Sequence, residues 1–117
     1  MTRFRALEIS YQVIRSLRAT VNVVRRRSDR LARQIETAAS SVSLNLGEGS
    51  RRLGKDRLHH FRIAAGSADE VRCGLRVAEA WGYVEEADVA ESLQLLDTLL
   101  AMLFALSRGR KMATRVD

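Results

Sequence analysis

The chain has 117 residues, no proline, one cysteine and a formal net charge of +6. This length predicts one domain with a substantial core, and a hydrophobic content of 46% excludes a disordered protein. The single cysteine excludes an intrachain disulfide, and the charged start of the chain shows no secretion signal, so we expect a cytoplasmic protein. The longest apolar run, residues 99–106, is shorter than the ~20 residues of a membrane-spanning helix, so no membrane association is expected.

The first predicted helix covers residues 4–24. Apolar side chains recur there every three or four residues, which is the spacing of one helical face. The predicted inward face consists of Leu7, Tyr11, Ile14, Leu17, Val21 and Val24. Ile9, Val13 and Val23 lie off this face, so the apolar surface is wider than one core contact requires.

The second and third predicted helices cover residues 30–47 and 56–80, and Ser28 or Asp29 is placed to cap the second. Gly66 in the middle of the third helix costs ~1 kcal/mol relative to alanine, which predicts a close approach of another helix there. The predicted inward residues are Leu31, Ile35, Ala38, Val42 and Leu46 on the second helix, and Leu58, Phe61, Ala65, Ala68, Val71, Leu75 and Ala78 on the third.

The fourth predicted helix covers residues 85–107, after a turn in which Gly82 ends the third. Its predicted inward face is Val89, Leu93, Leu96, Leu100, Leu103 and Leu106, with further apolar residues on its other sides. A helix that is apolar nearly all round predicts a subunit interface. Residues 108–117 are expected to form a basic, irregular tail. The whole pattern predicts an all-α protein, with residues 1–117 forming one up-down-up-down antiparallel four-helix bundle.

Small polar residues cluster on facing stretches of the second and third helices. Ser41, Asn45 and Glu48 share one helical face, and Ser67 and Glu70 form a second cluster at helical spacing. We expect these side chains to hydrogen-bond across the two helices. A small-molecule site around Glu48 and Glu70 is the alternative.

No pattern in the sequence predicts an enzyme. The adjacent His59 and His60 point about 100° apart on a helix and cannot chelate one metal together. Neither histidine follows a glutamate by three residues, which excludes the di-iron bundle motif. Cys73 has no nearby histidine and is expected to be a core or semi-core residue. We therefore expect no catalytic residue, no metal and no cofactor.

Basic residues are concentrated in the first half of the chain. Residues 1–62 contain 14 Lys and Arg against five acidic residues, a net of +9, whereas residues 63–117 contain six against nine, a net of −3. This distribution favours an RNA or DNA partner bound through its phosphates. A well-solvated surface, or a scaffold for a partner protein, is the alternative. The candidate nucleic-acid-binding residues form two clusters expected at opposite ends of the bundle: Arg25, Arg26, Arg27, Arg30 and Arg33, and Arg51, Arg52, Lys55 and Arg57.

The central stretch resembles a bacterial family of proteins encoded in intervening sequences of the 23S ribosomal RNA gene. The family's pattern is roughly S-I-x-x-N-I-x-E-G, a basic residue, an aromatic residue, then A-x-G-S-x-x-E. Residues 41–49, SVSLNLGEG, match the first part, and Phe61 with residues 64–70, AAGSADE, matches the rest. Valine replaces isoleucine at Val42, and glycine stands at Gly47 where alanine is usual.

The resemblance implies a four-helix bundle that assembles as a ring, a homopentamer. A similar fold serves the accessory variability determinant of diversity-generating retroelements, a basic pentamer that binds nucleic acid and reverse transcriptase. No activity is implied for the ribosomal-intervening-sequence relatives themselves. The signature residues, which we assign to the bundle architecture, are Ser41, Asn45, Glu48, Gly49, Gly66, Ser67 and Glu70.

Overall fold

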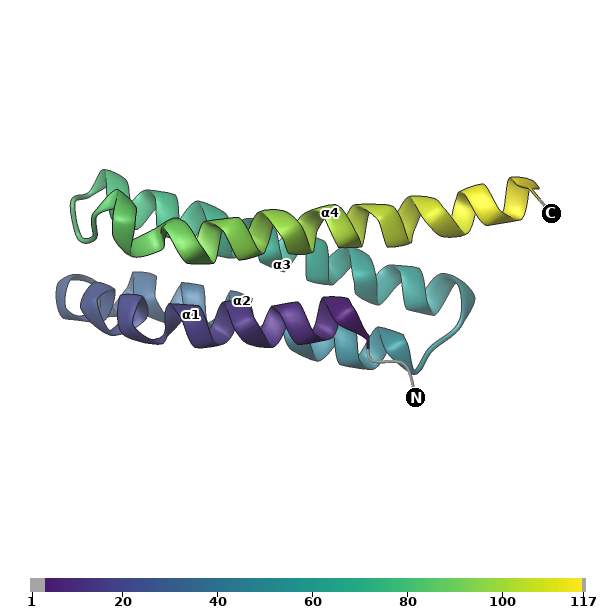
Figure 1. The fold of residues 1–117 in the computed structure, drawn as a ribbon. Coiled ribbons are helices and arrows are strands. Elements are labelled where there is room, and N and C mark those ends of the chain that lie inside the picture. The colour runs from purple at the N-terminus through teal and green to yellow at the C-terminus, as the bar shows by residue number, and fades with distance from the viewer. Residues whose placement is uncertain (1–3, 117) are drawn as a thin grey trace.

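Four helices run alternately up and down and form an elongated bundle (Figure 1). This computed structural model describes the backbone of residues 4–116 and the side chains of residues 4–107. Each helix packs against its neighbours in sequence, and the first also packs against the last. The expected all-α antiparallel four-helix bundle is thus confirmed. The helices are α1 (Arg5–Arg27), α2 (Asp29–Ser50), α3 (Gly54–Ala80) and α4 (Glu86–Val116).

Local capping explains two of the helix boundaries. The Ser28 hydroxyl accepts a hydrogen bond from the Leu31 amide at 3.1 Å and so starts α2 as expected. At the end of α3, Gly82 adopts a φ of +79°, and the amide of Tyr83 reaches back to the carbonyl of Ala78 at 2.9 Å. This arrangement satisfies carbonyls that the last turn leaves without helical partners, and it needs a residue without a Cβ at position 82.

The helices are longer than the sequence patterns predicted. The first ends at Arg27 instead of Val24, and the second continues to Ser50, so Gly47 and Gly49 lie within it and do not end it. The largest difference is in α4, which continues to Val116 through the expected irregular tail, while residue 117 lies outside the described residues. In Figure 1 the last turns of α4 extend beyond the connection between α2 and α3. The absence of proline permits such extensions.

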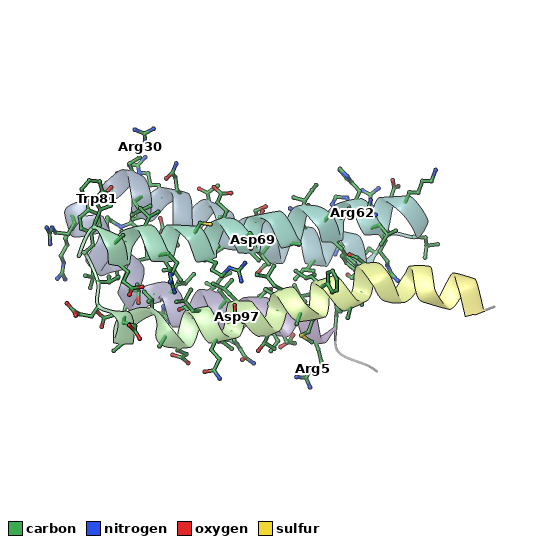
Figure 2. All side chains as sticks on the ribbon, turned by 90° about the horizontal axis from the view of Figure 1, so that it is seen from above. Arg5, Arg30, Arg62, Asp69, Trp81 and Asp97 are labelled. Atoms are coloured by element: carbon green, nitrogen blue, oxygen red, sulfur yellow. The ribbon has the colours of Figure 1, made fainter. Side chains whose placement is uncertain are left out.

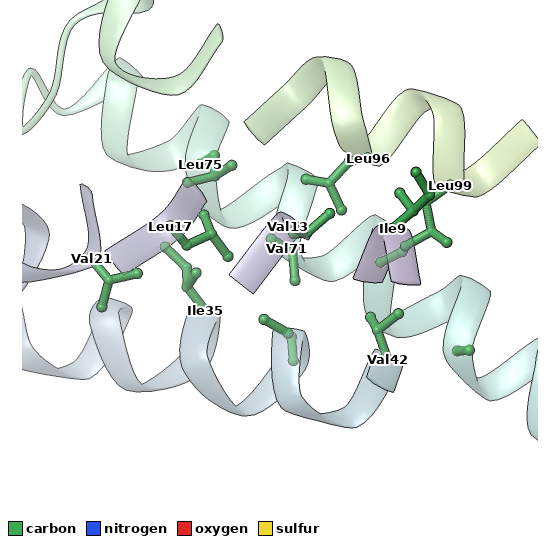
Figure 3. Close-up of a cluster of buried hydrophobic side chains, with 14 of the residues drawn as sticks. Ile9, Val13, Leu17, Val21, Ile35, Val42, Val71, Leu75, Leu96 and Leu99 are labelled. Atoms are coloured by element: carbon green, nitrogen blue, oxygen red, sulfur yellow. The ribbon is translucent and has the colours of Figure 1, made fainter. Parts of the chain in front are cut away.

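The core runs along the whole bundle and takes branched apolar side chains from all four helices (Figure 3). The predicted inward faces of α2 and α3 are largely confirmed. On α1 the second half of the predicted face, Leu17, Val21 and Val24, is buried as expected, whereas the first half was wrong. Tyr11 is 39% exposed, and Leu7 and Ile14 are only partly buried, whereas Ile9 and Val13 are buried. The apolar residues of α1 lie on two overlapping faces of the helix. The buried face also contains the polar residues Ser10 and Thr20, which a search for apolar spacing does not select.

Hydroxyl groups on the buried side of α1 make this choice of face possible. Ser10 is 1% exposed and shares a hydrogen bond of 2.8 Å with the Ser43 hydroxyl of α2. Thr20 donates to the carbonyl of Asp88, and Ser16 shares a 2.7 Å bond with Ser92 of α4. A buried hydroxyl is costly unless it is hydrogen-bonded. These bonds remove that cost and fix α1 against both of its neighbours.

Close approach of the helices depends on glycines other than the one predicted. Gly66 is exposed, and a Cβ added there would meet no atom within 4 Å. A Cβ at Gly49, by contrast, would lie 2.8 Å from the Phe61 ring, and one at Gly74 would lie 2.8 Å from Ile35. The close contacts between α2 and α3 are therefore at Gly49 and Gly74.

The segment Glu86–Ser107 of α4 is long and apolar enough to cross a membrane by length and composition, with a mean hydropathy of 1.6. No single run of apolar residues reveals this, because Ser92, Asp97 and other polar residues interrupt the segment. One side of α4 packs in the core through Val89, Leu96, Leu99 and Leu103. A helix packed in a protein core can have the same composition as a membrane-spanning helix, so this composition alone does not assign α4 to a membrane.

Candidate nucleic-acid interface

The two clusters of basic residues lie at opposite ends of the bundle, as expected (Figure 1). We call one the Trp81 end: the turns between α1 and α2 and between α3 and α4, residues 25–33 and 79–86. The other is the Arg52 end: the connection between α2 and α3, residues 48–57. The 22 residues of α2 that separate the clusters span about 33 Å, roughly three times the ~10 Å over which salt screens charges. The two clusters therefore act independently on any charged partner.

At the Arg52 end, most of the basic side chains already have partners. Arg52 donates from Nε and Nη2 to one carboxylate oxygen of Glu48, at 3.0 and 2.8 Å, and Arg51 contacts the other oxygen at 3.2 Å. The hydrogen bonds and the charge of Arg52 hold the pKa of Glu48 below its ordinary value. The two arginines thus neutralise the end of their own helix.

Arg57 is used to close the C-terminus of α2. Its guanidinium donates to the carbonyls of Gly49 and Ser50 at 3.3 and 3.1 Å and lies 6.0 Å from the centre of the Phe61 ring. These carbonyls belong to the last turn of α2, where helical partners are missing. Within the described residues, Lys55 is the member of this cluster without a hydrogen bond or ion pair.

At the Trp81 end, two arginines are paired with acidic side chains. Arg25 contacts Asp29 at 3.3 Å and Glu36 at 2.5 Å, and Arg33 contacts Asp29 at 2.8 Å. The hydrogen bond to Glu36 raises the pKa of the Arg25 guanidinium further above its ordinary value.

Arg26 and Arg30 are the basic residues of the Trp81 end that have no hydrogen bond, ion pair or aromatic contact among the described side chains, whereas Arg27 lacks an acidic partner but contacts an aromatic ring. Arg26 and Arg30 are both exposed, and among the described side chains neither has an acidic partner within salt-bridge distance. Arg30 lines a shallow depression with Arg33, Gln34, Thr37 and Glu70. Two guanidinium groups are therefore presented to solvent from α1 and α2.

An aromatic group lies at the same end and was not predicted from the sequence. The rings of Trp81 and Tyr83 are nearly parallel, with an interplanar angle of 13° and centroids 6.3 Å apart. The Arg27 guanidinium lies 5.1 Å from the centre of the Tyr83 ring. Figure 2 shows Trp81 and Arg30 at the same end of the molecule. The up-down topology is the signal that could have found this group, because it places the first and third turns together.

The expected hydrogen bonds between α2 and α3 form in part: Ser41, Asn45 and Ser67 make them, whereas Glu48 pairs with the arginines that follow it. Ser41 and Ser67 share a bond of 2.8 Å between their hydroxyls, and the Asn45 side-chain oxygen lies 3.0 Å from Nδ1 of His60. Asn45 also donates to the carbonyl of Ser41 at 2.9 Å. His60 is thus part of this network, which fixes the register between the two helices.

The structure does not bring Glu48 and Glu70 together. Glu48 contacts the arginines of its own helix end, whereas Glu70 lies in the depression beside Arg30 and Arg33. Within the described residues there is no group of three or more His, Cys, Asp or Glu side chains that could hold a metal. Cys73 is exposed, so its expected place in the core was wrong.

A comparison with protein families now gives this geometry a context. The family model described as "23S rRNA-intervening sequence protein" matches residues 5–105. The chain belongs to the 23S rRNA-intervening sequence protein family. The match includes both clusters of arginines and the whole hydrogen-bonded network between α2 and α3.

A solved structure supports the same fold for this 23S rRNA-intervening sequence protein. It is described as a protein with unknown function from the S23 ribosomal protein family of Bacteroides thetaiotaomicron VPI-5482. The TM-score is 0.78 at 14% identity, and the alignment covers 87% of this chain and 97% of that one. No curated protein matches the chain. At this identity the likeness shows the fold alone.

The signature residues have different roles within this family member. Ser41, Asn45 and Ser67 join α2 to α3, and Gly49 gives room for Phe61. Gly66 and Glu70 are exposed. The assignment of the signature to bundle architecture therefore has direct contacts to support it for the first group.

Proposed function

We propose that this protein is a non-enzymatic, oligomeric helical bundle that binds RNA or DNA through its basic ends. The observation that supports this most directly is the exposed pair Arg26 and Arg30 beside the Arg27–Tyr83 contact. Phosphate binding needs cations that are free to leave water and contact an anion. The paired Arg25 and Arg33 contribute less to such binding, because an anion must compete with Asp29 and Glu36.

The test replaces both unpaired arginines in the variant Arg26→Glu/Arg30→Glu. We expect the affinity for a short nucleic-acid duplex to fall by about tenfold or more, and the dependence of affinity on salt to become less steep. Fluorescence anisotropy over a series of salt concentrations measures both quantities. Unchanged affinity and slope in this variant would contradict the proposal.

A matched control separates local contact from overall charge. Arg15 and Arg18 are exposed on the middle of α1, away from both ends. The variant Arg15→Glu/Arg18→Glu changes the net charge by the same amount, so a general loss of attraction affects both variants equally. We expect the control to retain most of the affinity. Equal losses in the two variants would count against a site at the Trp81 end.

Exposed apolar side chains support the oligomeric part of the proposal. Leu44 is 72% exposed, Leu53 is 82% exposed and Phe104 is 61% exposed. Large apolar groups in such positions are typical of surfaces that another subunit covers. We propose a homopentameric ring, following the family resemblance. Light scattering on the purified protein tests this, and a single species of 13.1 kDa would contradict it.

The same apolar side chains favour a second candidate, a scaffold that binds a partner protein and no nucleic acid. The acidic second half of the chain, with a net of −3 over residues 63–117, provides a surface for such a partner. Recovery of one protein in stoichiometric amount after nuclease treatment, together with no binding of added RNA or DNA, would favour the scaffold over the first proposal.

A further inference from the structure

Trp81 is the one tryptophan of the chain, and the fold makes little use of its ring. The side chain is 70% exposed at the C-terminus of α3. A tryptophan contributes to folding mainly through the large area that it buries. This ring leaves most of that area in water.

The other residues of the same turn have clear structural roles. Gly82 supplies the positive φ, Tyr83 is partly buried against the core, and Val84 is 5% exposed. Trp81 itself has an ordinary helical backbone conformation, with φ −74° and ψ −11°. Since neither the backbone nor the core requires tryptophan here, the ring is available for a partner.

The surroundings of Trp81 combine flat groups with positive charge on one side. Its ring lies nearly parallel to Tyr83, and Tyr83 in turn is covered by the Arg27 guanidinium. Arg30, on α2, lies at the same end (Figure 2). Arg26 is in the last turn of α1, which meets α2 at this end. The opposite side is acidic, because α4 begins there with Glu86 and Asp88. A polyanion that contacts the ring is therefore drawn towards α1 and α2 and repelled by α4.

We propose that Trp81 stacks on an unpaired base of a single-stranded nucleic acid whose phosphates contact Arg26 and Arg30. Every base has a flat π-face, so stacking on an aromatic ring gives affinity without sequence preference. A base inside a duplex presents no free face to such a ring. The inference rests on the proposed nucleic-acid binding and adds to it a preference for single strands.

The experiment uses the intrinsic fluorescence of Trp81, which reports this site alone because the chain has one tryptophan. The full-length protein is titrated with a short oligothymidylate and with a duplex of the same length. We expect the single strand to quench the fluorescence and the duplex to bind with much less quenching. Trp81→Ala should weaken single-strand binding by about tenfold and leave duplex binding unchanged.

Two further variants and a salt series make the result specific. Trp81→Phe keeps a ring and should retain much of the single-strand affinity. Tyr11→Ala removes another exposed aromatic side chain, on α1 and away from the turns, and should have no effect. The salt dependence should not change in Trp81→Ala, because no phosphate contact is lost, whereas it should change in Arg26→Glu/Arg30→Glu.

The outcomes distinguish failure of this inference from failure of the proposed function. If both nucleic acids bind and depend on Arg26 and Arg30, but Trp81 is not quenched and its removal has no effect, stacking is overturned while nucleic-acid binding stands. If neither nucleic acid binds, the proposed function fails and this inference fails with it. If the fluorescence changes with protein concentration alone, Trp81 lies at a contact between copies of the chain, which also overturns the stacking.

Discussion

The two ends of the bundle contain similar numbers of basic residues, five at the Trp81 end and four at the Arg52 end, and use them differently. At the Arg52 end, Arg51 and Arg52 neutralise Glu48 and Arg57 caps the carbonyls of α2. At the Trp81 end, Arg26 and Arg30 remain unpaired among the described side chains, next to an exposed aromatic ring. Charge counted along the sequence treats these ends as equal. Among the described side chains, the contacts leave Lys55 without a partner at the Arg52 end, where Arg57 ties α3 to α2, and leave two arginines, Arg26 and Arg30, without a partner at the Trp81 end.

From this difference between the two ends we expect mutations at each end to affect different properties. Changes at the Arg52 end should reduce the free energy of unfolding, and changes to exposed side chains at the Trp81 end should reduce binding without affecting folding.

The largest effect is expected for Gly49→Ala at the Arg52 end. A Cβ there would lie 2.8 Å from the Phe61 ring and 3.0 Å from Cβ of His60, and neither group is the far end of a flexible chain. Overpacking of this kind costs about 1–3 kcal/mol, which outweighs the ~1 kcal/mol that alanine gains over glycine in a helix. Urea denaturation should show a lower free energy of unfolding.

Gly66→Ala is the matched control for that variant. The position is also within a helix, but a Cβ meets nothing within 4 Å. Only the helix propensity changes, so we expect a gain of about 0.5–1 kcal/mol. A loss of stability in Gly66→Ala, or a gain in Gly49→Ala, would contradict the proposal that Gly49 is closely packed and Gly66 is not. A loss of oligomer mass in Gly66→Ala would instead assign this exposed glycine to a subunit contact.

The next effect concerns Arg57. Removing its side chain in Arg57→Ala leaves the carbonyls of Gly49 and Ser50 without these donors, and we expect a loss of about 1 kcal/mol. Arg57→Lys keeps the charge but not the guanidinium geometry, so it should recover only part of the loss. Arg26→Ala at the other end should change stability by less than about 0.5 kcal/mol. Equal effects of Arg57→Ala and Arg26→Ala would remove the distinction between the two ends.

The sequence predicted the number of helices, their antiparallel order and most of the core of α2, α3 and α4, because apolar spacing decides these features. On α1 it predicted the burial of Leu17, Val21 and Val24 but missed that of Ile9 and Val13. The buried face also contains Ser10 and Thr20, whose hydroxyls hydrogen-bond to other helices. Pattern reasoning treats such residues as exposed. Their partners are separated from them by 33 and 68 residues, a relation that only the tertiary structure contains.

Only part of the candidate site could be predicted, again because tertiary contacts decide the rest. The two clusters of arginines are visible in the sequence, but whether each guanidinium is paired depends on contacts within and between helices. Trp81 is 51 residues from Arg30 by numbering, and only the topology places both at one end. The predicted close helix contact at Gly66 was wrong for a similar reason. A glycine inside a helical pattern does not indicate whether another helix packs against it.

The smallest expected effect is the pH dependence contributed by Glu48. The hydrogen bonds and charge of Arg52 lower the pKa of this carboxyl in the folded protein. A group with a depressed folded pKa stabilises the protein above its unfolded pKa, about 4.3 for glutamate, and this stabilisation is lost as the pH falls through the folded value. Glu48→Gln should therefore melt slightly earlier than the wild type at neutral pH, and the difference should shrink in acid.

The control for this small effect is Glu91→Gln, at an exposed position of α4 with no ion pair among the described side chains. Melting curves of the three proteins between neutral and acidic pH isolate the contribution of the Glu48–Arg52 pair. If the difference between wild type and Glu48→Gln persists unchanged in acid, the pair does not stabilise the end of α2. Arg52 would then be free for phosphate binding, and the two ends of the bundle would be equivalent as nucleic-acid sites.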